Sequence, residues 1–179
     1  MQRIPAMRQE QYERELFRRN SQCLDLWNIL DEVKDPEIPV LSLWDMGVLR
    51  DVQREDDRIT VTITPTYSGC PAMDVMREDI EIALRENGIV NYSVETQLSP
   101  AWTTDWMTDK GREQLRDYGI AAPNDALEQS GRETPENGVR CPRCGSVDTH
   151  RVSEFASTAC KALFQCDDCF EPFDYFKKL

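Results

Sequence analysis

The chain has 179 residues and a formal net charge of -12, a length that allows one domain of ordinary size and a small additional module. Acidic side chains are concentrated in the middle, where residues 21–120 contain twenty Asp and Glu against nine Lys and Arg. Affinity for nucleic acid comes largely from Lys and Arg that neutralise phosphates. The charge therefore excludes nucleic acid as an expected partner.

The location of the protein follows from its apolar segments and its cysteines. No stretch approaches the roughly 18 apolar residues of a membrane span, and the N-terminus lacks the apolar core of a signal peptide. We therefore expect a cytoplasmic protein with no membrane partner. In that reducing compartment the seven cysteines, four of them in two Cys-x-x-Cys pairs, indicate metal or redox chemistry and not a disulfide framework.

The first segments in chain order predict two helices. Residues 1–20 form a charged extension, and within it residues 8–19 favour a helix with almost no apolar stripe, either solvated or bound to a partner. Ser21 is the expected N-cap of the next helix, which ends before Pro36. Its apolar positions recur at three and four residues: Cys23, Leu26, Trp27, Leu30 and Val33.

The segments that follow predict a compact α+β domain. Residues 48–52 and 59–64 are expected strands joined by a charged hairpin at 54–57, because apolar residues alternate with Thr in the second strand. A helix is expected to begin at Pro71 and to end at Asn87 and Gly88, followed by a strand at 92–98. These elements form a helix-strand-strand-helix-strand layer. Beyond it, a shorter helix is expected from Thr108 to Gly119, and the domain is expected to span residues 21–120.

The C-terminal segment predicts a metal-binding module. Residues 121–139 have nothing to bury and are interpreted as a linker. In residues 140–179, Cys141 and Cys144 lie on one tight turn that Gly145 permits, and Cys166 and Cys169 form a second pair. Four soft thiolates favour structural zinc, with an iron-sulfur cluster as the alternative. We therefore predict a C-terminal zinc ribbon.

Two other residues of this module are not expected to bind the metal. His150 could ligate a metal ion, but four cysteines already complete a tetrahedral site. Cys160 lies six residues before Cys166 and belongs to no pair, so it is interpreted as a small, partly buried thiol.

A second candidate site surrounds Cys70. If Pro71 opens a helix, Cys70 lies at the helix N-terminus, where backbone N–H groups and the helix dipole favour a thiolate. Such a thiolate could bind metal, attack an electrophile or be oxidised, although a buried thiol without chemistry remains an alternative. The carboxylates of Asp35, Glu37 and Asp45 could lie nearby, as additional ligands or as loop caps.

These motifs carry a resemblance to a known family. Asp35-Pro-Glu-Ile-Pro-Val, Asp45-Met-Gly and Thr64-Pro-Thr-Tyr-Ser-Gly-Cys-Pro resemble the domain shared by SufT and the cytosolic iron-sulfur assembly factors. From about Ser21 onward the chain resembles the PaaD (PaaJ) family, through Leu98-Ser-Pro-Ala-Trp-Thr-Thr-Asp-Trp-Met, Ser157-Thr-Ala-Cys-Lys-Ala-Leu and Glu171-Pro-Phe-Asp-Tyr-Phe. Relatives tend to carry another Cys where this chain has Lys178, so that thiol is not required here.

The resemblance implies an accessory factor of the phenylacetyl-CoA epoxidase in phenylacetate degradation. Proteins of this family are thought to assist insertion of an iron-sulfur cluster or metal into the reductase or oxygenase component. The implied partners are the other epoxidase subunits, especially the iron-sulfur flavin reductase. The implied cofactors are structural zinc and a transient iron or iron-sulfur cluster, for which Cys70, Asp35 and Glu37 are the candidate residues.

The sequence offers little for catalysis by the chain itself. It has one His, no pair of Glu-x-x-His motifs for a di-iron site and no Gly-rich dinucleotide fingerprint. We therefore expect a protein that is not an enzyme. Three hypotheses remain: a maturation factor that holds iron or a cluster at Cys70, a structural subunit of the epoxidase in which Cys70 merely packs, and a thiol enzyme or redox switch.

Overall fold

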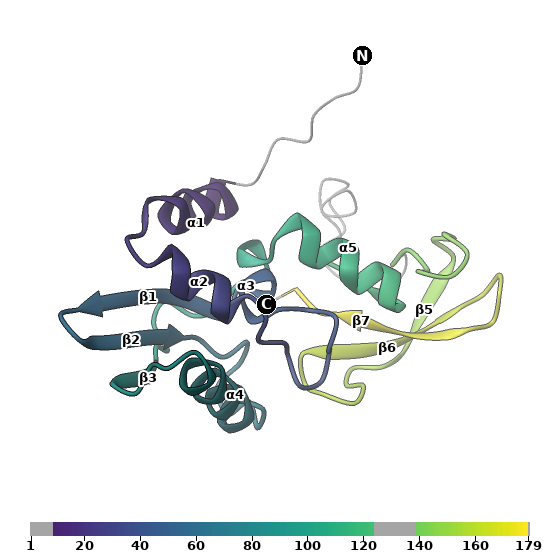
Figure 1. Cartoon of the computed structure of the whole chain (residues 1–179). Coiled ribbons are helices and arrows are strands. Elements are labelled where there is room, and N and C mark those ends of the chain that lie inside the picture. Colours follow the sequence, from purple (N-terminus) through teal and green to yellow (C-terminus); the bar gives the residue numbers. More distant parts are fainter. Residues whose placement is uncertain (1–8, 124–138, 179) are drawn as a thin grey trace, which may run out of the picture. The chain divides into compact units, whose positions relative to one another are not determined.

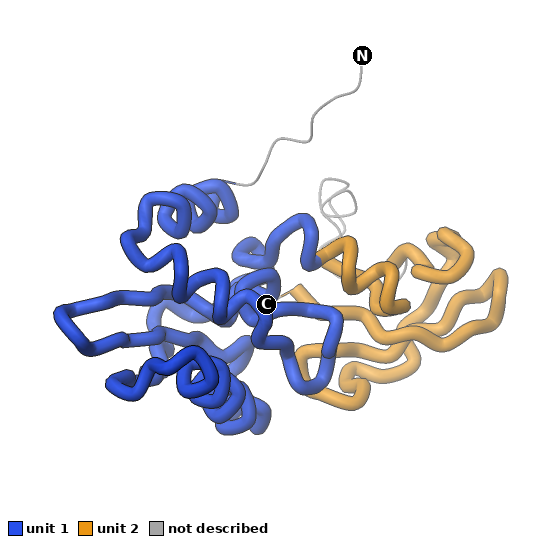
Figure 2. The backbone as a smooth tube through the Cα atoms, viewed as in Figure 1, with its two compact units in different colours: residues 1–111 blue, residues 112–179 orange. Residues whose placement is uncertain are grey.

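The computed structural model describes residues 9–123 and 139–178 and divides the chain into two compact units, residues 1–111 and 112–179 (Figure 2). The first unit contains the predicted helix-strand-strand-helix-strand order (Figure 1). Its elements are α1 (Gln9–Asn20), α2 (Leu24–Leu30), α3 (Leu43–Met46), β1 (Leu49–Glu55), β2 (Arg58–Ile63), α4 (Met73–Glu86), β3 (Tyr92–Thr96) and the 3-10 helix η1 (Thr104–Trp106). The predicted α+β class is confirmed.

The sheet of the first unit has the strand order β1-β2-β3. β1 and β2 are antiparallel neighbours, with Val52 opposite Val61, and β2 pairs in parallel with β3, with Val61 opposite Val94. The alternation expected in the second strand is present, since Ile59, Val61 and Ile63 are buried. The parallel pairing requires a crossover connection, which α4 provides.

Helices α2 and α4 contact each other, and α4 also contacts β3. The buried face of α2 belongs to the apolar stripe that periodicity predicts and contains Leu26, Trp27 and Leu30. The buried face of α4 contains Met76, Ile80 and Leu84. Both helices are shorter than expected. α4 has Ala72 as its N-cap, so Pro71 lies before the helix and does not open it.

The N-terminal helix, expected to be solvated or bound to a partner, instead packs on the first unit of its own chain as α1. The Arg14 side chain is buried and donates hydrogen bonds to the carbonyl oxygens of Trp44 at 3.1 Å, Leu49 at 3.3 Å and Trp106. Its guanidinium also lies 4.2 Å from the centre of the Trp44 ring. A guanidinium has five N–H donors and a flat face, so an Arg can fill a buried site that an apolar stripe would otherwise occupy.

The segment after α3 approaches η1 closely. Gly47 ends α3 with φ +85°, and a Cβ atom there would lie 2.8 Å from the Cβ of Trp106. The Asp45 side chain, also in α3, accepts a hydrogen bond from the Thr108 hydroxyl at 2.7 Å. These contacts fix residues 104–108 against α3.

The second unit contains α5 (Asp109–Tyr118) from Arg112 onward, β4 (Ile120–Ala121), β5 (Thr149–Ser153), β6 (Lys161–Cys166) and β7 (Pro172–Phe176). Its sheet has the order β4-β7-β6-β5, in which β5, β6 and β7 are antiparallel and β4 runs parallel to β7.

The units divide between Gly111 and Arg112, not at residue 120 as expected for the first domain. Pairing of β4 with β7 explains the difference, because it attaches this part of the chain to the second sheet. The ends of the expected linker, residues 121–139, are also not free of packing, since Ala121 and Val139 are buried in a hydrophobic cluster. Residues 1–8, 124–138 and 179 lie outside the described residues.

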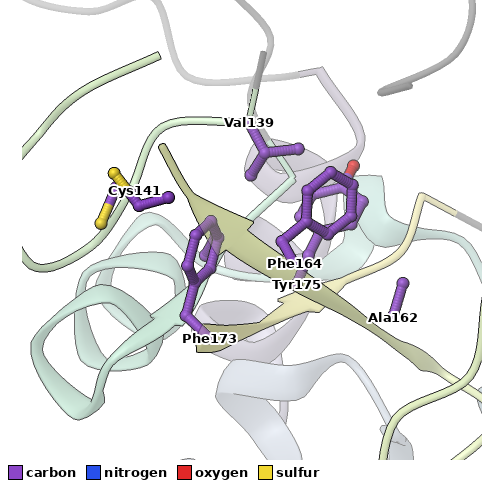
Figure 3. Close-up of a cluster of buried hydrophobic side chains, with 8 residues drawn as sticks. Val139, Cys141, Ala162, Phe164, Phe173 and Tyr175 are labelled. Atoms are coloured by element: carbon purple, nitrogen blue, oxygen red, sulfur yellow. The ribbon is translucent and has the colours of Figure 1, made fainter. Parts of the chain in front are cut away.

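That cluster is the core of the ribbon. Phe164 lies at its centre, with ring centres 6.0 Å from Phe173 and 5.5 Å from Tyr175. Figure 3 shows Cys141 at the edge of the same cluster. The apolar core of the second sheet therefore includes two of the paired cysteines, Cys141 and Cys166. Among the described residues, no helix is long and apolar enough to cross a membrane.

Candidate functional site

Four cysteine side chains converge in the second unit. The sulfur atoms of Cys141, Cys144, Cys166 and Cys169 all lie within 4.8 Å of one another. Each Cys-x-x-Cys pair sits on a turn that a backbone hydrogen bond closes. The Gly145 N–H donates to the Cys141 carbonyl at 2.9 Å, and the corresponding N–H in the second turn donates to the Cys166 carbonyl at 3.0 Å. We call these turns, residues 141–145 and 166–170, the first and second knuckles.

The spacing of the sulfur atoms fits a tetrahedral metal ion. Cys141 Sγ lies 3.8 Å from Cys169 Sγ, and Cys144 Sγ lies 3.5 Å from Cys166 Sγ. A zinc ion with bonds of about 2.3 Å to four thiolates places the sulfur atoms about 3.8 Å apart, whereas a disulfide places them about 2.0 Å apart. The four residues therefore form a cluster capable of binding a metal, and none of the seven cysteines is in a disulfide.

The backbone of the second knuckle stabilises a thiolate. The N–H group of Cys169 donates to the Cys166 sulfur, and that of Asp168 also does so. These hydrogen bonds outweigh the effect of burial and lower the pKa of Cys166 to about 7. Cys166 thus favours the charge state in which cysteine binds metal, whereas burial and the neighbouring thiols raise the pKa of Cys169 and of Cys144.

His150 and Cys160 lie outside this group of four, as their sequence positions suggested. The His150 ring nitrogen Nδ1 lies 2.8 Å from a carboxylate oxygen of Asp167. Cys160 is buried at the start of β6, and its sulfur lies 3.0 Å from the Thr158 hydroxyl.

We expect the Cys160→Ala variant to retain its metal, because a tetrahedral ion with four thiolates has no place for a fifth. The change removes one buried sulfur atom, and a destabilisation of about 1 kcal/mol is expected from the lost packing. Metal content per chain, measured by mass spectrometry of the digested protein, checks this prediction. A variant without metal would show that the cysteines have been assigned to the wrong set.

Cys70 lies in the loop between β2 and α4, three residues before α4 begins. It is half-buried, and its sulfur accepts hydrogen bonds from the Ala72 N–H and the Tyr67 hydroxyl. Burial nevertheless raises the pKa of Cys70, and the negative charges of Glu37 and Asp35 raise it further. The expectation that a helix N-terminus would favour a thiolate at Cys70 is therefore wrong, because the residue precedes the helix and has carboxylates near it.

The carboxylates of Asp35 and Glu37 are close enough to Cys70 to raise the pKa of its thiol. Asp35 also has hydrogen-bond partners of its own. Asp35 is buried, and its Oδ1 atom accepts hydrogen bonds from the N–H groups of Glu37 at 2.9 Å and Ile38 at 2.7 Å. Within residues 9–123 and 139–178, only the four ribbon cysteines gather three or more ligand atoms within 4.8 Å. Cys70, Asp35 and Glu37 therefore do not form a preassembled three-ligand site.

The sequence interpretation missed two features, namely one contributor to the Cys70 site and the way in which Asp45 is anchored. Tyr67 donates to the Cys70 sulfur, and its place in the Thr-Tyr-Ser-Gly-Cys segment was the available signal. The second is the anchoring of Asp45, a carboxylate considered as an additional ligand. It accepts hydrogen bonds from Ser42, Thr108 and Lys110, so it joins two segments of the first unit.

Two family models match the chain. Residues 25–91 match a family described as iron-sulfur cluster assembly protein, and residues 126–177 match a family described as PaaD zinc beta ribbon domain. The first match contains Cys70, and the second contains all four ribbon cysteines.

Individual relatives agree with these matches. The chain is 50% identical, over 87% of its length and 93% of the relative, to a putative 1,2-phenylacetyl-CoA epoxidase subunit of Escherichia coli K12. It is 32% identical, over 51% of its length and 88% of the relative, to an Fe-S protein maturation auxiliary factor of Porphyromonas gingivalis. A crystal structure of a domain of unknown function from Bacillus anthracis aligns with a TM-score of 0.48 and 23% identity, covering 58% of this chain and 95% of that chain.

Proposed function

The chain belongs to the PaaD family, and from this premise we propose that it is an accessory factor which assists insertion of iron or an iron-sulfur cluster into a component of the phenylacetyl-CoA epoxidase. The expected client is the iron-sulfur flavin reductase, with the oxygenase component as the alternative. In this proposal the protein works in the cytoplasm, where thiols stay reduced, and it catalyses no reaction of its own. Its partners are epoxidase subunits, not nucleic acid or membrane.

The observation that carries the proposal is the placement of Cys70 within the segment that matches the iron-sulfur assembly family. The negative charges of Glu37 and Asp35 act on the Cys70 sulfur, and the same charges attract a cation to it. When iron binds, the Cys70 thiol loses its proton to solvent and the sulfur becomes a ligand.

The direction of the pKa shift suits a carrier more than a permanent site. Because the pKa of Cys70 is raised, a proton competes with bound iron for the sulfur more strongly than at an ordinary cysteine. Bound iron is then released readily to a client that offers more thiolates. The same shift counts against a thiol enzyme or redox switch, because the thiolate is the reactive form.

For the ribbon we propose zinc, held by Cys141, Cys144, Cys166 and Cys169. Soft thiolates at tetrahedral spacing match the ligand preference of zinc. An ion bound there cross-links the two knuckles and has no open position for chemistry. The second candidate function, a structural component of the epoxidase, is favoured by the half-burial of Cys70 and by the name of the Escherichia coli relative, which describes it as an epoxidase subunit.

We expect cells whose only copy carries Cys70→Ser to grow poorly on phenylacetate, with a reductase that contains less than half of its normal iron and sulfide. Serine is close in size to cysteine but supplies no soft thiolate at neutral pH, so the fold and the ribbon metal should remain. Iron and acid-labile sulfide in the purified reductase measure the effect. A Ser68→Ala variant of the exposed neighbouring residue is the matched control and should behave as wild type.

The same experiment decides between the two candidate functions. Normal growth and a fully loaded reductase with a folded Cys70→Ser protein would reduce Cys70 to a packing residue and support the structural role. Normal amounts of every epoxidase subunit are required for the maturation interpretation, since a missing subunit would indicate a failure of assembly instead.

A further inference from the structure

The second knuckle contains an aromatic residue in an unfavourable backbone conformation. Phe170 follows Cys169 and has φ +61°, a left-handed conformation that large side chains rarely adopt because Cβ crowds the neighbouring carbonyl. Its counterpart in the first knuckle is Gly145, with φ +79°. Each of these residues donates its N–H to the carbonyl of the first cysteine in its knuckle, Cys141 or Cys166. The knuckle therefore imposes a conformation that suits glycine.

The ring of Phe170 gains little burial in return for this strain. Phe170 is 73% exposed, more than any other aromatic residue among those described, and it is not part of the hydrophobic cluster of the ribbon. Its backbone is fixed on both sides, since its carbonyl also accepts a hydrogen bond from the Gln165 side chain at 3.1 Å. Strained residues that are held by their surroundings are concentrated at functional positions. An exposed aromatic ring on a fixed backbone is the kind of residue that anchors a protein interface.

The residues that flank Phe170 in the sequence carry acidic side chains. Asp167, Asp168 and Glu171 are exposed, and no Lys or Arg occurs between residues 162 and 176. Asp167 contacts His150, but no ion pair within the described part of the chain involves Asp168 or Glu171. An apolar ring with an acidic border complements an apolar pocket with a basic border.

We propose that Phe170 is the anchor by which this protein docks on its client. The ring inserts into an apolar pocket of the partner protein, and Lys or Arg side chains at the border of that pocket face Asp168 and Glu171. The identity of the partner rests on the function proposed above, so the pocket belongs to the phenylacetyl-CoA epoxidase. Residues at the centre of such interfaces, aromatic ones above all, contribute most of the binding energy.

The test measures binding of the full-length protein to the epoxidase complex, which is purified from cells that lack the accessory protein. We expect Phe170→Gly to raise the dissociation constant at least tenfold, while metal content is unchanged and the melting temperature is unchanged or higher. Loss of binding without loss of stability distinguishes a docking residue from a structural one. Phe170→Asn, which tolerates the left-handed conformation, should weaken binding in the same way and guards against a folding defect in the glycine variant.

Two further variants sharpen the result. Phe155 is also an exposed aromatic residue of the second unit, 61% exposed, with the Lys177 amine 4.1 Å from the centre of its ring. Phe155→Ala is therefore the matched control and should bind within twofold of wild type. The double variant Asp168→Lys and Glu171→Lys should weaken binding, and the remaining affinity should depend less on salt concentration.

Wild-type affinity of the Phe170→Gly protein would overturn the docking inference and leave the proposed function standing. Failure of the wild-type protein to bind the complex would overturn the docking inference as well. The proposed function is decided separately, by iron and sulfide in the reductase of Cys70→Ser cells, so the two failures are distinguishable.

Discussion

Replacing Cys166 by serine is expected to remove the metal from the ribbon and to unfold residues 140–178. Cys166 is completely buried and belongs to the hydrophobic cluster of the second sheet as well as to the four-cysteine cluster. The free energy of zinc binding to such modules is roughly 10–16 kcal/mol, and it acts as folding free energy because the site does not exist in the unfolded chain. The apolar cluster around Phe164 is too small to replace it.

The experiment compares zinc per chain and the nuclear magnetic resonance spectrum of the wild-type and Cys166→Ser proteins. We expect close to one zinc per wild-type chain, none in the variant, and loss of dispersion only for signals of the ribbon. Cys160→Ala is the matched control, because it also removes a buried thiol, from the residue directly before β6. This variant should keep its metal and a spectrum like that of wild type. A coloured wild-type protein that contains iron at the ribbon would contradict the assignment of zinc.

The parts of this structure that sequence predicts best are those in which one residue pattern has one physical solution. The two Cys-x-x-Cys pairs predict the meeting of four thiols because two such pairs together supply the four ligands of a tetrahedral metal site. The alternation at Ile59, Val61 and Ile63 predicts β2, since a one-residue slip would expose the whole apolar face. In both cases short-range spacing determines the outcome.

Contacts between distant segments were not predictable in the same way. Arg14 belongs to a segment without an apolar stripe, and its burial depends on three carbonyl groups that only the folded unit brings together. Residues 120 and 121 were placed at a domain end, although their pairing with β7 attaches them to the ribbon sheet. The prediction of a thiolate at Cys70 failed for a related reason. Helix α4 begins after Pro71, and the carboxylates of Glu37 and Asp35, 33 and 35 residues earlier in the chain, act on the thiol.

Asp45→Ala is expected to destabilise the first unit by about 3 kcal/mol, because it removes the acceptor for several buried donors. The Asp45 side chain is 3% exposed and accepts hydrogen bonds from Ser42 at 3.0 Å, Thr108 at 2.7 Å and Lys110 at 2.8 Å. The Lys110 side chain is 62% exposed, so its ion pair contributes little after solvent screening. The larger cost comes from the Ser42 and Thr108 hydroxyls, which would stay buried without their acceptor.

The pH dependence of stability separates the charge of Asp45 from its shape. Burial opposes ionisation of Asp45, but hydrogen bonds from Lys110, Thr108 and Ser42 outweigh burial and hold the pKa of this carboxyl below its ordinary value of 3.8. A lowered pKa means that the unfolded chain binds the proton more tightly, so stability rises with pH through this range. The contribution is complete above the unfolded pKa and is lost as pH falls through the folded pKa. Denaturant midpoints between pH 7 and 3 should therefore fall more steeply for wild type than for Asp45→Asn, and equal slopes would show that folding does not lower the pKa of Asp45.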